Sequence, residues 1–245
     1  METRSYFRII SDKSLSAKEN MAVDEALLSS YKEGDYPVFR LYSWENSFTI
    51  GVSQQFNDYP ITALYNGNYA KRVTGGGVLF HGHDLSYSLV IPTALLQGLN
   101  IKESYEKICT FILNFYKNLG LDAKYVKDND TIALAKSEYC QVGFEAYDIL
   151  VNGKKIGGNA QRRTKKAIFQ HGSIPIFKHN NKDLDDKVGI TLEDFGIKLD
   201  YEKAKILLKE SFEKTFNVEL INSRLTQVEE DTKKRLLKEK YDYSN

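Results

Sequence analysis

Cysteine is scarce in this sequence of 245 residues, which contains only Cys109 and Cys140. Two cysteines exclude a disulfide framework and a zinc ribbon, because both need more thiols. Long apolar runs are missing too, and the first residues, METRSYFRIISDK, carry charges where a signal peptide needs an apolar stretch. These absences predict a soluble cytoplasmic protein with reduced thiols.

An excess of charge of either sign is also missing, since 34 basic residues face 33 acidic ones and the net charge is +1. This balance argues against nucleic acid and against a membrane surface as partners. We find no internal repeat, low-complexity segment or clear linker in the chain. The length fits one domain, residues 1–245, which we divide into a core, 1–220, and a closing helix, 221–245.

The apolar periodicity predicts helices and strands in mixed order. Helices are expected at 16–31, 59–68, 104–119, 190–195, 201–215 and 225–241. Strands are expected at 6–10, 38–42, 48–52, 78–80, 85–91, 123–126, 147–151, 155–156 and 167–176. Capping boxes mark two helix starts, Ser16 with Glu19 and Thr226 with Glu229, and Asn152-Gly153 is typical of a two-residue hairpin turn. The predicted fold class is α+β, a mixed sheet flanked by helices.

A glycine-rich turn stands out between residues 71 and 90, KRVTGGGVLFHGHDLSYSLV. Glycines without Cβ let the backbone approach a ligand and point N–H groups at it. Arg72 beside such a turn suits an anionic or carbonyl oxygen. The alternative is an ordinary strand-to-strand turn with solvated charges, because Gly is the default turn residue.

A second polar, glycine-containing stretch, residues 137–173, includes Cys140 and a basic cluster that begins at Arg162. A Cys near Lys and Arg can have a depressed pKa and attack acyl groups as a thiolate, although an inert loop thiol remains the alternative. Cys109 lies on the apolar stripe of a predicted helix, which predicts a buried structural thiol. The pair Lys165-Lys166 fits a solvated face or a docking patch for an acidic protein. The pair Gly157-Gly158 is expected to break the strand that precedes it.

The histidines do not predict a metal site. His81, His83 and Asp84 lack the i, i+4 spacing of helical ligands, and no cluster of Cys or carboxylates supports them. His171 in QHGS is expected to fix a turn or to line a pocket. We therefore predict no bound metal.

Two motifs resemble signatures of the biotin/lipoate ligase superfamily, in its lipoate–protein ligase and octanoyltransferase branch. RVTGGGVLFH is similar to R-x-x-G-G-G/R-A-V-x-H, and GKKIGGNAQRR is similar to G-K/R-K-h-x-G-x-A-Q. The resemblance extends to the strand pair around Trp44, Gly51 and Gln54, to QHGSI and to the last helix. It implies a mainly antiparallel sheet of the catalytic-domain type. It also implies substrate-binding roles for Arg72, Gly75, Gly76, Gly77, His81, Gly158 and Gln161.

The position of Cys140 ahead of the lysine hairpin resembles the cysteine-dependent octanoyltransferases. In these enzymes the Cys is the acyl-enzyme nucleophile and the hairpin lysine orients the thioester carbonyl, so the resemblance implies that Cys140 and Lys155 are catalytic. The implied reaction moves an octanoyl or lipoyl chain from octanoyl-acyl carrier protein, through a Cys140 thioester, to a lysine of a lipoyl domain or glycine-cleavage H protein. No cofactor is expected. For the tail we expect an apolar slot walled by Val78, Phe80 and Leu85.

Two departures from this pattern leave alternatives open. Gln141-Val142 replaces the more usual Phe-Asp, and the three glycines are a ligase-like spelling. The first alternative is an ATP-dependent lipoate–protein ligase, which would use ATP and Mg²⁺. The second is a non-catalytic lipoyl-domain binder that keeps the pocket.

Overall fold

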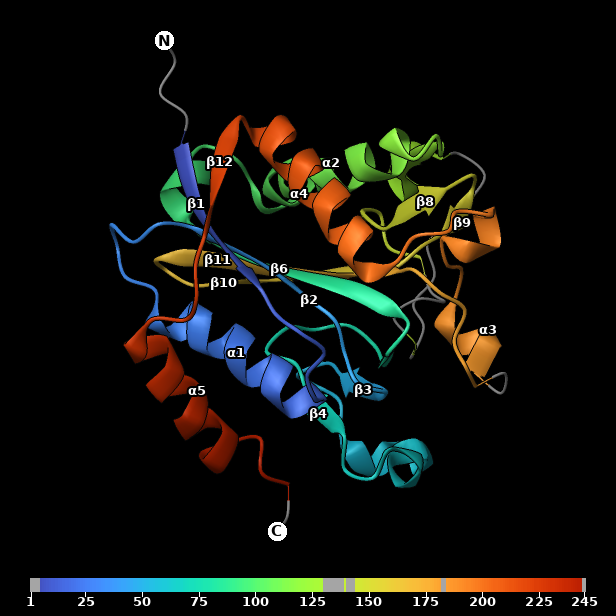
Figure 1. The fold of residues 1–245 in the computed structure, drawn as a ribbon, viewed down its shortest axis with the longest axis horizontal. Helices are drawn as coiled ribbons and strands as arrows, with labels where there is room; N and C mark the ends of the chain where they lie inside the picture. Colours follow the sequence, from blue (N-terminus) through green and yellow to red (C-terminus); the bar gives the residue numbers. More distant parts are fainter. Residues whose placement is uncertain (1–4, 130–138, 140–143, 182–183, 244–245) are drawn as a thin grey trace.

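The computed structural model describes residues 5–129, 139, 144–181 and 184–243. Cys140 lies outside the described residues. The chain folds around a six-stranded sheet whose strands lie in the order β10, β11, β6, β2, β1 and β12 (Figure 1). In that order their bounds are Gly158–Arg163, Ala167–Pro175, Asp84–Pro92, Val38–Tyr42, Ser5–Ser11 and Val218–Asn222.

The sheet is mixed and mainly antiparallel, as predicted. The pairs β10–β11, β11–β6 and β6–β2 are antiparallel, whereas β1 pairs in parallel with β2 and with β12. Two three-stranded sheets complete the fold, in the orders β4-β3-β5 and β7-β8-β9. Their strands span, in chain order, Ser47–Ile50, Tyr69–Lys71, Leu79–His81, Ala123–Tyr125, Ile149–Val151 and Lys154–Lys155.

Helices cover both faces of the central sheet. On one face α1 (Ala17–Ser30) packs beside α5 (Gln227–Glu239), and on the other α2 (Ile101–Asn118) packs beside α4 (Tyr201–Phe216) (Figure 1). A short helix, α3, spans Asp185–Val188. None of the helices in the described ranges has the length and apolar character needed to cross a membrane.

Aromatic side chains dominate the core between the sheet and the α2–α4 layer. The Phe39 ring on β2 stacks on Phe212 of α4 at 4.2 Å and meets Phe111 of α2 edge-on at 5.6 Å. All three side chains are buried. Edge-on and offset aromatic pairs add favourable electrostatics to the burial of apolar area, so this cluster fixes both helices on the sheet.

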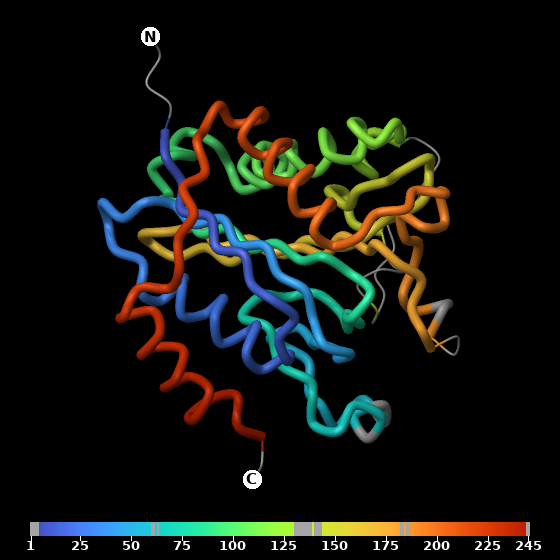
Figure 2. The backbone as a smooth tube through the Cα atoms, viewed as in Figure 1, coloured from blue at the N-terminus to red at the C-terminus, as the bar shows by residue number. Residues whose placement is uncertain are grey.

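The N-terminal and C-terminal segments of the chain pack against each other through α5. Figure 2 shows the C-terminal helix beside the N-terminal one. The guanidinium of Arg8 on β1 binds both carboxylate oxygens of Glu229, at 2.8 and 2.9 Å. Strand β12 runs across the expected boundary at residue 220 and pairs with β1.

Local sequence signals placed most element ends correctly. The Ser16–Glu19 and Thr226–Glu229 capping boxes are both present. Asn152 and Gly153 have φ of 48° and 78° and form the turn between β8 and β9. The predicted helices at 59–68 and 190–195 are only short 3₁₀ turns, Pro60–Tyr65 and Glu193–Phe195. The predicted break at Gly157-Gly158 is confirmed, because β9 ends at Lys155 and Gly157 adopts φ of 64°. The strand that follows the break, β10, was not predicted.

Candidate active site

Arg72 holds the glycine-rich turn from inside. Its Nη2 donates to the carbonyl oxygens of Gly77 at 2.6 Å and Gly75 at 3.3 Å, and its Nη1 donates to the hydroxyl of Thr49 at 2.8 Å. The side chain is buried. Two of the oxygens that Arg72 binds therefore belong to the turn itself, and these contacts hold the turn in place.

Two glycines allow the turn to pack. Gly76 adopts φ of 100°, a conformation that side chains with a Cβ rarely adopt. A Cβ added to Gly51, at the end of β3, would overlap the carbonyl oxygen of Gly76. Any side chain at position 51 would push the turn away, so the first strand pair and the glycine motif form one unit.

His81 lies at the end of β5 in a ring of polar and aromatic contacts. Its Nε2 is 2.9 Å from the Thr49 hydroxyl, its Nδ1 is 3.1 Å from Asp84 Oδ2, and its ring stacks on Trp44 at 3.7 Å. Burial alone would raise the pKa of Asp84, but His81 and the hydroxyl of Ser173 lower that pKa to about 2. The carboxylate is therefore charged and fixes the His81 ring.

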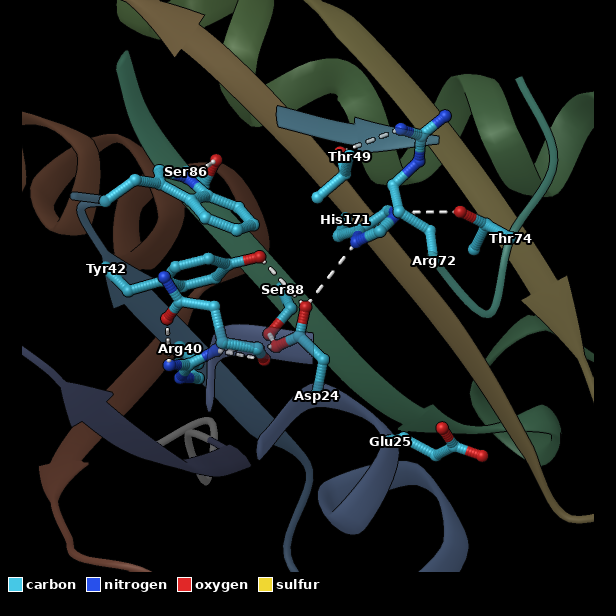
Figure 3. Close-up of polar contacts among 12 residues, drawn as sticks. Asp24, Glu25, Arg40, Tyr42, Thr49, Arg72, Thr74, Ser86, Ser88 and His171 are labelled. Carbon is cyan, nitrogen blue, oxygen red and sulfur yellow. Dashed lines mark hydrogen bonds and ion pairs between the residues drawn. The ribbon is translucent and has the colours of Figure 1, made fainter. Parts of the chain in front are cut away.

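A second buried network joins α1 to the glycine turn through His171 on β11 (Figure 3). Asp24 accepts hydrogen bonds from Arg40 Nη1 at 2.8 Å and from the hydroxyls of Tyr42 at 2.9 Å and Ser88 at 2.7 Å. Burial would raise the pKa of Asp24, but His171 and the charge of Arg40 lower it. The carboxylate therefore stays ionised inside the protein.

His171 bridges this carboxylate and the turn. Its Nδ1 is 3.5 Å from Asp24 Oδ2 and its Nε2 is 2.7 Å from the Thr74 hydroxyl. Burial lowers the pKa of His171, so the ring is neutral, and a proton on Nδ1 beside Asp24 leaves Nε2 to accept from Thr74. The order Asp–His–hydroxyl resembles that of a hydrolase triad. Thr74 is only 1% exposed, however, which assigns the hydroxyl to positioning rather than attack.

A pocket opens between the two motifs. Of the predicted substrate-binding residues, it is lined by Arg72, His81 and Gly158. Its other walls include Met21, Trp44, Leu79, Asn159, Ala160 and His171. Apolar side chains beside a few polar groups suit a substrate with a hydrocarbon chain and one polar end.

The expected slot residues Val78, Phe80 and Leu85 are not among the described residues that line this pocket. Side chains alternate along β5, so Leu79 points into the pocket while Phe80 packs with Phe48 and Tyr65 behind it. Leu85 belongs to the main core. Val78 and Phe80 therefore pack together behind this pocket, and Leu79 between them lines it.

None of the other predicted site residues in the described ranges lines this pocket. Gly75, Gly76 and Gly77 form the turn but do not line the pocket. Gln161 on β10 donates from Nε2 to Oε1 of Gln170 at 3.0 Å. Lys155 is buried, with its Nζ 2.6 Å from Asp148 Oδ2, whereas Lys154 is exposed. The hairpin therefore turns Lys155 inward and Lys154 outward.

Of the two cysteines, Cys109 is among the described residues and Cys140 is not. Cys109 on α2 is fully buried, with the Gln170 amide nitrogen 3.2 Å from its sulfur, and burial raises the pKa of the thiol to about 12. The predicted burial of Cys109 is confirmed. Tyr139, which precedes Cys140 in the sequence, forms a parallel bridge with Val78 and stacks on Phe80 at 6.2 Å.

The histidines expected not to form a metal site occupy separate environments. His81 contacts Asp84, His171 contacts Asp24, and His83 lies edge-on to His179 at 5.2 Å. Within the described ranges, no three His, Cys, Asp or Glu side chains are arranged to hold a metal ion.

Sequence reasoning missed Asp24, Arg40 and Thr74. A signal for the first was present, because Asn20 and Asp24 are spaced i, i+4 on the inward face of α1. Both side chains are buried. Polar groups on the buried face of a helix need hydrogen-bond partners. Here the guanidinium of Arg40 donates to both side chains.

Comparisons with known proteins define the family. The profile of the lipoyl protein ligase A/B catalytic domain matches residues 16–190. The chain is 30% identical to octanoyltransferase LipM of Anoxybacillus flavithermus, over 98% of this chain and 96% of that protein. It is 28% identical to octanoyltransferase LipM of Bacillus subtilis, over 96% and 95%. The protein belongs to the lipoyl protein ligase A/B catalytic domain family.

Solved structures share the fold. A lipoate-protein ligase A bound with ATP superposes with a TM-score of 0.78 at 22% identity, covering 98% of this chain and 96% of that one. The bi-partite lipoate protein ligase of Thermoplasma acidophilum gives 0.76 at 23% identity, covering 97% and 94%. At these sequence identities, the structural similarity shows that the chain shares the fold of these proteins.

Proposed function

We propose that the protein is an octanoyltransferase of protein lipoylation. The observation that carries this proposal is its similarity to an octanoyltransferase over nearly the full length of both chains. We take octanoyl-acyl carrier protein as the donor and a lysine of a lipoyl domain or of glycine-cleavage H protein as the acceptor. The reaction belongs in the cytoplasm, where the Cys140 thiol stays reduced.

The proposed reaction has two steps. First, the Cys140 thiolate attacks the donor thioester carbonyl, the bond from that carbon to the carrier sulfur breaks, and the carrier thiol leaves with the proton that Cys140 lost. Second, the uncharged amine of the acceptor lysine attacks the octanoyl-Cys140 thioester. The amide forms, and the amine proton passes to the released thiolate. An amide is more stable than a thioester, so the proposal includes no ATP and no other cofactor.

Lys155 is suited to polarise the reacting carbonyl. Its ammonium is buried and is held at 2.6 Å by the Asp148 carboxylate, and a fixed cation in a site shielded from water stabilises the oxyanion that forms. Lys154 points to solvent and lacks this environment. The apolar pocket walls Met21, Trp44 and Leu79 would hold the octanoyl tail, at about 0.8 kcal/mol per buried CH₂.

The test is acyl transfer with and without ATP. Purified protein is mixed with octanoyl-acyl carrier protein and a lipoyl domain, with or without ATP and Mg²⁺, and the acceptor mass is measured. We expect one octanoyl group on the acceptor lysine at the same rate in both mixtures. A parallel mixture supplies free lipoate and ATP instead of the carrier protein, and we expect no product there.

The other two functions predict different results. A lipoate–protein ligase would modify the acceptor only with free lipoate and ATP, and a non-catalytic binder would modify it in neither mixture. Either result would overturn the proposed function.

A further inference from the structure

One stretch of 34 residues carries charge of a single sign. Residues 149–182 contain no Asp or Glu, although the whole chain has 33 acidic residues and a net charge of +1. The same stretch contains eight cations: Lys154, Lys155, Arg162, Arg163, Lys165, Lys166, Lys178 and Lys182. Six of the eight lie on β9, on β10 and in the turn that follows β10.

Four of these residues gather at the end of the β10–β11 hairpin, and we call Arg162, Arg163, Lys165 and Lys166 the hairpin cations. Three are exposed and Arg163 is half-buried. Within the part of the chain that the structure describes, none of the four makes an ion pair. Among the described residues, Arg162 and Arg163 donate to neutral oxygens, of Val73 at 3.1 Å and of Gln161 at 3.4 Å.

The backbone that carries the hairpin cations is fixed. The Thr164 hydroxyl accepts from the backbone N–H of Ala167 at 3.0 Å, and the N–H of Thr93 donates to the Lys166 carbonyl at 3.1 Å. Strand β10 lies at the edge of the sheet, with β11 on its inner side. A fixed, exposed cluster of like charges is organised for a partner before the partner binds.

A surface hollow that the hairpin cations line also contains a carboxylate, and this carboxylate is already neutralised. Glu25 shares this hollow with Arg162, Lys165 and Lys166. Its oxygens accept from Lys240 Nζ at 2.7 and 2.8 Å and from the Tyr241 hydroxyl at 2.6 Å. The Glu25 carboxylate therefore does not neutralise the hairpin cations.

The same strand connects this cluster to the pocket. Gly158, Asn159 and Ala160 at the start of β10 line the pocket, and Arg163 ends the strand. At a rise of about 3.3 Å per residue, the two ends lie roughly 16 Å apart. A partner bound at the hairpin cations must therefore deliver its reactive group across that distance.

We propose that the hairpin cations are the docking surface for an acidic carrier protein, which delivers the acyl thioester to the pocket on its long prosthetic arm. The inference rests on the proposed function and names the binding surface of its donor. An acceptor lysine has only its own four-carbon stem, so an acceptor domain must bind at the pocket mouth. A carrier protein can bind farther away. Complementary charge raises the rate of encounter and fixes the orientation of the partner.

The experiment reverses two of the hairpin cations in the full chain. For the double variant Lys165→Glu/Lys166→Glu, we expect KM for octanoyl-acyl carrier protein to rise about tenfold or more, with kcat changed less than about twofold. The dependence of kcat/KM on salt should become weaker, because attraction between exposed charges is what salt screens.

A matched control carries the same charge change elsewhere. Lys203 and Lys214 are exposed on α4, which covers the opposite face of the sheet from α1 (Figure 1). The variant Lys203→Glu/Lys214→Glu should keep the wild-type KM for the carrier protein. A second arm uses octanoyl-pantetheine, a thioester without the carrier protein, and the hairpin variant should use it no worse than the control variant does.

Each other outcome has a definite meaning. An unchanged KM for the carrier protein overturns the docking surface, and so does an equal loss with octanoyl-pantetheine, which would place the defect in the pocket. A rise in KM for the lipoyl domain alone would assign the surface to the acceptor and overturn the inference. If wild-type protein transfers nothing from the carrier protein, the proposed function fails instead.

Discussion

The Nε2 atom of His171 lies 2.7 Å from the hydroxyl of Thr74, and this contact ties β11 to the glycine turn. Arg72 fixes the same turn through the carbonyls of Gly75 and Gly77. The turn that resembles a ligand-binding motif is therefore held at two points by buried side chains. Its position is set before any substrate arrives.

The first prediction tests this contact by a double-mutant cycle. His171→Phe and Thr74→Val each leave a buried polar partner unsatisfied, so each should lower the free energy of unfolding by about 1–3 kcal/mol. The double variant removes both partners together and should lose less than the sum of the single losses, by about 1 kcal/mol. Urea denaturation of the four proteins measures the cycle. Strictly additive losses would show that the two side chains do not interact.

The second prediction concerns the two lysines of the β8–β9 hairpin. Lys155→Ala removes the buried ammonium and should lower kcat for acyl transfer by roughly 10²-fold, whereas exposed Lys154→Ala should keep nearly wild-type activity. Asp148→Asn should give an intermediate loss, since it weakens the contact that positions Lys155. Thermal unfolding of each variant checks that the fold survives. The reverse order of losses would reject Lys155 as the carbonyl-polarising group.

Local signals made much of this fold predictable. The capping boxes at Ser16 and Thr226 fix where α1 and α5 begin, because they satisfy backbone N–H groups within a few residues. The Asn152-Gly153 turn fixes the hairpin that buries Lys155. Such interactions depend on neighbouring residues alone, so the sequence displays them directly.

Features that depend on distant residues were not predictable in the same way. The edge strand β10 has little apolar alternation and exists because β11 pairs with it. Arg40 is a charged residue in a strand, and its burial becomes understandable only when Asp24 from α1 and Asp12 accept from it, at 2.8 and 2.6 Å. The pocket is lined by residues of both motifs. Predicting that Leu79 lines it required knowing which side chains of β5 face the pocket.

The third prediction follows from His83, whose two buried ring nitrogens have no hydrogen-bond partner among the described residues. Burial lowers the pKa of His83 from its ordinary value of 6.5 to about 4, although Asp84 opposes this shift. Between these pH values the unfolded chain binds a proton that the folded protein does not. The free energy of unfolding should therefore fall as pH drops from about 6.5 to 4.

The size of this effect is roughly 3 kcal/mol, from about 1.4 kcal/mol per pKa unit. His83→Phe keeps a planar ring and cannot be protonated, so its stability should decline less over the same range. Urea denaturation at pH 7.5, 6, 5 and 4 compares the two proteins, and the loss that remains in the variant reports the other groups, such as His171. Parallel curves for the variant and the wild type would contradict the prediction.

The last prediction concerns the nucleophile. Incubation with octanoyl-acyl carrier protein, without an acceptor, should add one octanoyl group to the protein as a thioester that hydroxylamine cleaves, because a thiolate attacks an acyl donor to give a covalent intermediate. Cys140→Ser should abolish this labile adduct. Cys109→Ser is the matched control and should retain it, since burial raises the pKa of the Cys109 thiol to about 12 and keeps that thiol protonated. Intact-protein mass spectrometry detects the adduct, and peptide mapping locates it. An octanoyl group on the peptide that contains Cys109, or an adduct that survives Cys140→Ser, would show that the acyl group does not pass through Cys140.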